Sequence, residues 1–294
     1  MCKIGILLVN YNGKNFLNDC INSIYKMKYK NIDILVVDND SHDNSIDLLE
    51  IEYPDVKVIK TGDNIGVAAG NNVGIRHFIK TDCDYILIMN NDVEVDKNML
   101  NYLIQQAGPN TITVPKIYYF NDKDVIWFGG GHINWHKGIC VHEGYNERDN
   151  KKYDSDRYIT YAPTCCMLVH KSVFDKIGIM DENYFMYFDD TDFCVRAIDG
   201  GVKILYVPKA FMWHKVSSSS GGPDSKISIY YNYRNQLYFI NKFKEKVRLS
   251  CYFYIHIRSI YKYLLSFLFH TNYTCLLECY MDFYNKNFGR KDFV

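Results

Sequence analysis

The first third of the chain alternates short apolar runs with amphipathic patterns. Between the first two apolar runs, hydrophobic residues recur at three- and four-residue spacing over residues 16–24, which predicts a helix. Strand, helix and strand in regular alternation are typical of a parallel sheet with helices on both faces. The apolar runs that predict its strands are residues 3–9, 32–38, 56–59 and 84–89.

Polar residues follow each of these four predicted strands. In open parallel sheets, ligands bind outside the carboxyl ends of the strands. We therefore expect one binding crevice, lined by the segments that end the strands. These segments are Asn10–Asn12, Asp38–Asp40, Thr61–Asn64 and Asn90–Asp92.

The remaining chain divides into three parts with different patterns. Residues 110–170 alternate as strands do and predict a hairpin-rich insertion, and residues 202–207 predict a further strand. The serine- and glycine-rich run 217–222 is typical of a flexible domain edge. We therefore expect an α/β domain over residues 1–222 and a helical C-terminal extension over residues 223–294.

The extension contains a strongly apolar stretch at residues 251–269. His256, Arg258 and Lys262 interrupt this stretch, and charged residues are costly at the centre of a membrane-spanning helix. The basic run KFKEKVR at residues 242–248 precedes it, a combination typical of an interfacial helix. Two expectations stay open, namely peripheral contact with the inner face of the cell membrane and packing on the domain.

Composition excludes several classes of protein. A content of 48% hydrophobic and 23% charged residues is typical of a globular chain, and 34 basic against 34 acidic residues give no field that would recruit nucleic acid. The ten cysteines include no C-x-x-C pair, which argues against a zinc site and for reduced thiols. The chain opens on an apolar run without a signal-peptide pattern, so we expect a cytoplasmic protein.

Three carboxylates, Asp189, Asp190 and Asp192, lie within four positions directly after an aromatic run. Acidic residues favour the positive end of a helix dipole, and a buried carboxylate can also serve as a catalytic base. Asp38 and Asp92 each end a predicted strand. From the residues alone, each is a helix cap or turn residue, or a ligand for Mg²⁺ or Mn²⁺ that bridges phosphate oxygens.

Six segments, in this order and at these spacings, resemble family 2 glycosyltransferases. The resemblance is closest to the bacterial rhamnosyltransferase-like branch of surface polysaccharide synthesis, and it covers residues 3 to about 222. It implies the GT-A fold, a Rossmann-like, mostly parallel sheet flanked by helices. The segments are LLVNYNG, LVVDNDSHDNS, DNIGVAAGNNVGI, ILIMNNDVEV, YFDDTDFCVRA and MWH.

The resemblance implies catalytic and metal-binding roles. Asp190 matches the family's catalytic base, and Asp189 stands where glutamate is usual. Asp92 matches the last acid of the family's D-x-D motif for Mg²⁺ or Mn²⁺, and His214 matches a histidine that can complete either the metal site or the diphosphate site. The motif here reads Asn90-Asn91-Asp92, so its first carboxylate is missing.

The resemblance also implies a set of donor-binding residues. Asp38 matches the carboxylate that reads the base of the nucleotide sugar, which favours a pyrimidine nucleotide. The other residues matched to the donor site are Asn10, Tyr11, Asn12, Asn64, Gly66, Asn72 and Asn91.

The implied reaction is an inverting transfer from a nucleotide-diphosphate sugar, either dTDP-rhamnose or a UDP-sugar. The implied acceptor is a glycan or a lipid-linked saccharide. Two alternatives stay open, namely a nucleotidyltransferase and a non-catalytic nucleotide-sugar or carbohydrate-binding module. The first should carry a glycine-rich basic loop after the first strand, where NYNGKNF offers only Lys14, and the second should lack Asp190 or His214.

Overall fold

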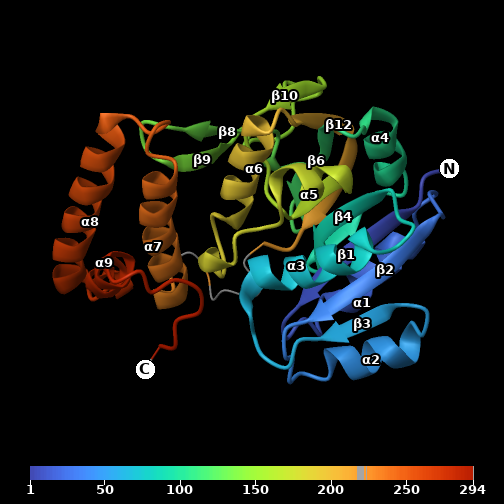
Figure 1. Ribbon diagram of the computed structural model, residues 1–294, viewed down its shortest axis with the longest axis horizontal. Helices are drawn as coiled ribbons and strands as arrows, with labels where there is room; N and C mark the ends of the chain where they lie inside the picture. Colours follow the sequence, from blue (N-terminus) through green and yellow to red (C-terminus); the bar gives the residue numbers. More distant parts are fainter. Residues whose placement is uncertain (217–221, 223, 294) are drawn as a thin grey trace.

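The computed structural model describes residues 1–216, 222 and 224–293, and its core is a large sheet with helices on both faces (Figure 1). Four parallel strands form one half of the sheet in the order β3-β2-β1-β4. Their bounds confirm the four strands predicted from the apolar runs. The strands are β1 (Ile4–Asn10), β2 (Ile32–Asp38), β3 (Lys57–Lys60) and β4 (Tyr85–Asn90), and the helices between them are α1 (Leu17–Tyr25), α2 (Ser45–Glu52) and α3 (Gly66–Ile79).

Beyond β4 the sheet becomes mixed. Strand β11 (Cys166–His170) lies antiparallel to β4, and β6 (Thr111–Tyr119) follows it. Strand β12 (Lys203–His214) is longer than the predicted 202–207, because it pairs with β6 as far as His214. Strands β8 (Gly131–Asn134) and β9 (Ile139–His142) form a separate two-stranded sheet. The other elements between β4 and β12 are β5 (Val93–Val95), α4 (Met99–Gln106), β7 (Ile126–Phe128), β10 (Arg157–Ile159), α5 (Ser172–Ile177), η1 (Glu182–Tyr184) and α6 (Asp189–Asp199).

The C-terminal extension is helical as far as Tyr284. It comprises α7 (Lys226–Lys242), α8 (Leu249–Phe269), η2 (Asn272–Cys275) and α9 (Leu276–Tyr284). Helix α7 contributes Phe239 and Ile240 to the same hydrophobic core as the sheet, and α8 lies outermost, beyond α7 (Figure 1). The expected flexible run falls largely on residues 217–221, outside the described part of the chain, and the domain boundary at 222 stays a prediction.

Helix α8 has one buried and one exposed face. Cys251, Ile255 and Ser259 are buried, so one face of α8 packs on the rest of the protein. This agrees with the expectation that the extension packs on the domain. Within the described residues, none of the helices combines the length and the apolar character needed to cross a membrane. All ten cysteines are free thiols.

Candidate active site

A cavity of about 520 Å³ opens at the carboxyl ends of β1, β2 and β4. Tyr11, Asn39 and Asn90–Asp92 line it from the strand ends, and Asn64 and Gly66 line it from the start of α3. Because this is the edge where a parallel sheet binds its ligands, the predicted crevice is present. We refer to it as the strand-tip cavity.

Asn10 joins three strand ends behind this cavity. Its side chain is fully buried, its Oδ1 accepts a hydrogen bond from Asn91 Nδ2 at 2.7 Å, and its Nδ2 lies 3.3 Å from Asp38 Oδ1 and 3.0 Å from Ser45 Oγ. A buried amide whose oxygen and nitrogen both form hydrogen bonds holds the neighbouring elements in a fixed relative position. Asn10 therefore positions the residues that line the crevice.

Asp38 lines a separate hollow of about 240 Å³ with Lys60 and Gly62. Its carboxylate accepts hydrogen bonds from the Ser41 hydroxyl at 2.6 Å and the Ser41 amide at 3.2 Å. Asn12 lies nearby, where its amide donates to Ser41 Oγ at 2.9 Å. The carboxylate is therefore oriented by the turn that follows β2.

Asp92 and His214 meet at the end of the strand-tip cavity. Strand β12 pairs with β5, so that His214 lies opposite Val93, and His214 Nε2 comes to 3.2 Å from Asp92 Oδ1. Both side chains are buried, and within the described part of the chain His214 Nδ1 has no hydrogen-bond partner. Carboxylate oxygen and imidazole nitrogen suit a divalent cation such as Mn²⁺. This pair of ligands therefore fits a divalent metal ion.

Asp33, Asp82 and Cys83 form the one group of three candidate metal ligands found among the described residues. Asp33 lies near the start of β2, and Asp82 and Cys83 precede β4, so the group is at the opposite end of the strands. Lys3 Nζ contacts both carboxylates, at 2.8 Å from Asp33 and 3.0 Å from Asp82. The lysine supplies the positive charge there, and we assign no metal to this group.

The acidic cluster opens helix α6, which begins at Asp189. The aromatic run before it is strained, because Phe185, Tyr187 and Phe188 have φ values of 57°, 62° and 67°. Bulky residues rarely adopt this left-handed region, and such strain concentrates at functional sites. The same acidic residues therefore open helix α6 and include the candidate base, Asp190.

Asp190 is the carboxylate of the cluster with an oriented, partly accessible side chain. Its Oδ2 accepts a hydrogen bond from the Tyr161 hydroxyl at 2.9 Å, and its Oδ1 accepts one from the Thr191 amide at 2.6 Å. Burial raises the pKa of Asp190, although both hydrogen bonds oppose the shift. A carboxylate with a raised pKa and a fixed orientation is suited to accept a proton.

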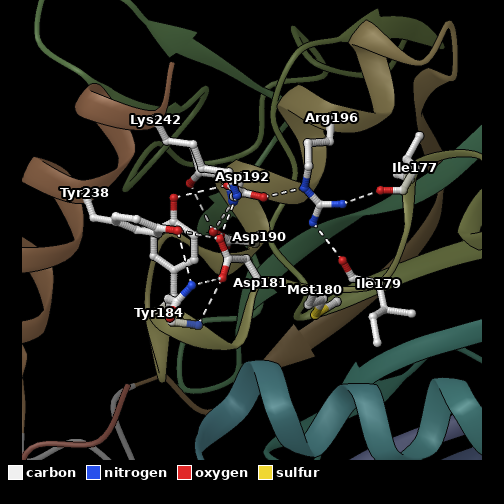
Figure 2. Close-up of polar contacts among 12 residues, drawn as sticks. Ile177, Ile179, Met180, Asp181, Tyr184, Asp190, Asp192, Arg196, Tyr238 and Lys242 are labelled. Atoms are coloured by element: carbon white, nitrogen blue, oxygen red, sulfur yellow. Dashed lines mark hydrogen bonds and ion pairs between the residues drawn. The ribbon is translucent and has the colours of Figure 1, made fainter. Parts of the chain in front are cut away.

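Asp189 and Asp192 have different surroundings. Burial and the neighbouring charge of Asp190 raise the pKa of Asp189 to about 8, and among the described residues its Oδ2 has no hydrogen-bond partner. Asp192 lies between two cations, with Arg196 Nε and Lys242 Nζ each at 2.5 Å (Figure 2). The cations on Asp192 indicate a structural ion pair that joins α6 to α7.

A chain of aromatic rings connects Asp190 to the Asp92–His214 pair. The Trp127 ring lies 4.7 Å from the His214 ring and 4.6 Å from the His142 ring. The His142 ring stacks on Tyr161 at 5.6 Å, and Tyr161 holds Asp190. Burial lowers the pKa of His142 to about 4, so this imidazole is neutral near pH 7. The predicted hairpin-rich insertion thus supplies a continuous aromatic wall.

Cys165 is a buried thiol directly before β11, next to the end of β4. Burial raises the pKa of this thiol, and the charges of Asp92 and Asp190 both add to the effect. The Cys165 carbonyl also accepts a hydrogen bond from the Asn90 amide at 3.1 Å. Both carboxylates therefore act electrostatically on the same buried thiol beside the end of β4.

The family model for glycosyl transferase family 2 matches residues 6–178, more than half of the chain. The chain belongs to this family. The matched range includes the strand ends as far as Asp92, whereas Asp190 and His214 lie beyond it. The match to the family model therefore does not bear on the roles of Asp190 and His214, which stay predictions.

Similar proteins agree with this family 2 membership. The chain is 25% identical to the low-salt glycan biosynthesis hexosyltransferase Agl10 of Haloferax volcanii, over 83% of this chain and 77% of that protein. It is 24% identical to the N-acetylglucosaminyl-diphospho-decaprenol L-rhamnosyltransferase of Mycobacterium tuberculosis, over 77% of this chain and 80% of that protein. The expected resemblance to rhamnosyltransferase-like members of the family is confirmed.

Solved structures confirm the GT-A fold. The crystal structure of GalNAc-T7 with UDP, GalNAc and Mn²⁺ superposes with a TM-score of 0.63 at 15% identity. The alignment covers 82% of this chain, and the chain spans about half the length of that protein, 48%. At this level of identity the similarity establishes the fold alone.

Of the remaining residues predicted to bind the donor, Gly66 lies at the strand-tip cavity and Asn72 does not. Gly66 has φ +86°, and a Cβ there would lie 2.5 Å from the Phe185 carbonyl oxygen, so glycine lets α3 contact the aromatic run. Asn72 is buried away from the cavity, where its Nδ2 donates to the Met180 carbonyl at 2.9 Å. Its neighbour Asn71 lines the strand-tip cavity instead.

Two site residues on α7 had no counterpart in the sequence prediction. Asn235 Nδ2 contacts the carbonyl oxygens of Tyr184 and Met186, each at 2.7 Å, and so holds the strained run. Arg234 is buried beside it and donates to the carbonyl of Asn183 at 3.2 Å. In the sequence, these two residues are marked only as an arginine and an asparagine among the aromatic residues of a predicted helix.

Proposed function

We propose that this family 2 chain is an inverting glycosyltransferase that moves a sugar from a nucleotide diphosphate to a hydroxyl group of a saccharide acceptor. The observation that carries the proposal is the oriented Asp190 carboxylate, connected through an aromatic wall to the Asp92–His214 pair. The donor is proposed to be dTDP-rhamnose or a UDP-sugar. The acceptor is proposed to be a glycan or a lipid-linked saccharide, as the name of the mycobacterial relative suggests.

Asp190 accepts the proton of the acceptor hydroxyl in this mechanism. The hydroxyl oxygen forms a bond to the anomeric carbon of the donor while the bond from that carbon to the phosphate oxygen breaks. A single displacement from the opposite face inverts the anomeric configuration. Tyr161 keeps Asp190 aimed at the acceptor, and the rings of Trp127 and His142 provide flat faces for sugars and exclude water.

Asp92 and His214 are the residues that would hold Mg²⁺ or Mn²⁺. The bound cation would neutralise charge on the departing diphosphate. Asp92 and His214 would supply two ligands to the cation, and oxygen atoms of the sugar donor and of water would supply the others, as is common for hard cations at phosphate sites. The asparagines at positions 90 and 91 leave Asp92 as the one carboxylate of this motif.

Nucleotide release tests the proposed function. The full chain is incubated with dTDP-, UDP- and GDP-sugars, with a detergent-solubilised prenyl-diphosphate saccharide as acceptor, and with or without Mn²⁺. We expect acceptor-dependent release with a dTDP- or UDP-sugar, and its loss after chelation of the metal. Absence of release with every donor, with and without Mn²⁺, would overturn the proposal.

We further propose that the exposed face of α8 contacts an anionic membrane surface. Its large apolar side chains recur at three- and four-residue spacing, so they form one stripe along the helix. Chain positions 246–277 contain no acidic residue, and the exposed Lys244 and Arg248 precede the stripe, which favours anionic lipid. The stripe consists of Leu249, Phe253, Ile257, Ile260, Leu264, Phe267 and Leu268.

Vesicle flotation tests this contact. We expect the chain to float with vesicles that contain phosphatidylglycerol, and Ile257→Glu with Leu264→Glu to reduce the bound fraction at least about tenfold, because each change removes apolar contact and adds repulsion. Ile51→Glu, at an apolar residue that is 77% exposed on α2, is the matched control. A dimer that the double change dissociates, without vesicle binding by the unmodified chain, would identify the stripe as a self-association surface and contradict the proposal.

A further inference from the structure

The strand-tip cavity has an unusual distribution of charge for a site that takes a nucleoside diphosphate. Its strand-end wall contributes the carboxylate of Asp92. Among the described residues, the cations that line the cavity are Arg290 and Lys291, and both come from the C-terminal segment that follows α9. Charge-assisted hydrogen bonds strengthen the binding of a dianionic or trianionic ligand, and in this cavity the cationic donors for them lie on this segment.

The C-terminal segment is held against the cavity by specific hydrogen bonds. The Gly289 amide donates to the Asn183 carbonyl at 2.8 Å, and the Gly289 carbonyl accepts from Arg234 Nη1 at 2.8 Å. The Arg290 guanidinium then contacts the Asp63 carboxylate and lies 3.4 Å from the Asn64 carbonyl. The segment thereby spans from the aromatic run before α6 to the polar turn before α3.

Lys291 and Phe293 make further contacts that hold the segment beside the strand-tip cavity. Its amide donates to the Tyr231 hydroxyl at 2.8 Å, and its Nζ lies 2.7 Å from Asp282. The Phe293 ring packs edge-on against Tyr230 at 5.2 Å. These contacts anchor the backbone on both sides of the two cations, so the cations stay beside the cavity.

We propose that residues 289–293 form a wall of the donor site, that Arg290 binds the anionic nucleotide part of the donor, and that Lys291, held by Asp282, adds positive charge beside it. The inference rests on the proposed glycosyltransferase function and adds two donor-site residues to it. Asp63 and Arg290 are 64% and 47% exposed, so their ion pair is weak and the guanidinium can exchange it for phosphate oxygens. Asp292 also lines the cavity and lies 3.3 Å from Arg290 Nε, which keeps the segment from being uniformly basic.

Equilibrium binding of nucleoside diphosphates tests the inference. UDP, dTDP and GDP are titrated into the full chain, into Arg290→Gln and into Arg290→Gln/Lys291→Gln, in the presence of Mn²⁺ and at several salt concentrations. We expect the Kd of the preferred nucleotide to rise about tenfold in the single variant and further in the double variant, as for loss of a charge-assisted hydrogen bond. We also expect a weaker dependence of the Kd on salt, which loss of a purely structural contact would not produce.

Arg148→Gln and Lys286→Gln are the matched controls. Arg148 is an exposed arginine paired with Asp122 at 3.1 Å, away from the cavity, and Lys286 is an exposed lysine of the same C-terminal stretch. Thermal denaturation confirms that each variant is folded. An unchanged or lower Kd in the double variant, with nucleotide binding by the unmodified chain intact, overturns this inference alone. Failure of the unmodified chain to bind any of the three nucleotides overturns the proposed function as well.

Discussion

Replacement of Asp190 by asparagine is expected to lower kcat by about 10²- to 10⁴-fold, which is the usual contribution of a general base. Asparagine keeps the shape of the side chain and can still pair with the Tyr161 hydroxyl, which lies 2.9 Å from Asp190 Oδ2. It cannot accept the proton of the acceptor hydroxyl. The measurement is initial nucleotide release with the donor that the unmodified chain uses, at saturating donor and acceptor.

The affinity for the donor is expected to be unchanged in Asp190→Asn, because Asp190 does not line the strand-tip cavity and the proposed mechanism places it beside the acceptor. Equilibrium binding of the nucleoside diphosphate therefore serves as the internal control for folding and donor binding. A variant that keeps near-full kcat would contradict the assignment of Asp190 as the base. A variant that instead loses nucleotide binding would place Asp190 among the donor ligands.

Tyr161→Phe is the matched variant, because it keeps the base and removes one hydrogen bond to it. That hydrogen bond lowers the pKa of Asp190 while burial raises it. The base acts in its ionised form, so activity rises with pH as Asp190 loses its proton. Without the Tyr161 hydroxyl the pKa rises further, and we expect the acid limb of the pH–rate profile to move to higher pH. The rate at alkaline pH is expected to recover in Tyr161→Phe and not in Asp190→Asn.

The sheet could be predicted because its strands are marked by local pattern. Each of the first four is a short buried run followed by a polar turn, and the structure ends them within two residues of the predicted positions. Strand β12 was predicted too short, since its second half reads as mixed aromatic and basic residues. Its pairing with β6 and β5 extends it to His214, and such long-range pairing is not visible in a local pattern.

The candidate site could be predicted at its strand ends and less well elsewhere. The approach of His214 to Asp92 follows from the family resemblance, and the structure places them 3.2 Å apart. The choice between Asn71 and Asn72 depends on the rotation of α3, which motif matching does not fix. The site residues of the C-terminal extension were missed because their partners lie far away in the chain. Arg234 binds backbone carbonyls of residues 183 and 289, about 50 positions away in each direction, and carbonyls leave no trace in a sequence pattern.

Replacement of Arg234 by methionine is expected to lower the free energy of unfolding by about 3 kcal/mol, because buried carbonyls lose their charged donor. Arg234 is 1% exposed, and its guanidinium donates to the carbonyls of Gly289 at 2.8 Å and Asn183 at 3.2 Å. Methionine fills much of the same volume without any donor. Urea unfolding followed by tryptophan fluorescence measures the change, with Arg148→Met at an exposed arginine as the control.

Arg234→Lys separates charge from geometry. Lysine keeps the positive charge, but its single ammonium group cannot reach two carbonyls from different segments as the planar guanidinium does. We therefore expect Arg234→Lys to recover less than half of the stability lost in Arg234→Met. A loss below about 0.5 kcal/mol in Arg234→Met would mean that water replaces the guanidinium, and that the carbonyls are not held by Arg234.

The same variants test how the strained run before Asp190 is maintained. Residues with positive φ, such as Tyr187 and Phe188, persist only where surrounding contacts over-determine the backbone. Arg234 and its neighbour Asn235 supply these contacts from α7, and Arg234 also holds Gly289 of the proposed donor wall. Loss of Arg234 should therefore reduce kcat and raise the KM for the donor together, whereas Asp190→Asn reduces kcat alone. The difference between these two kinetic patterns distinguishes a residue that positions both walls of the site from the base that acts within it.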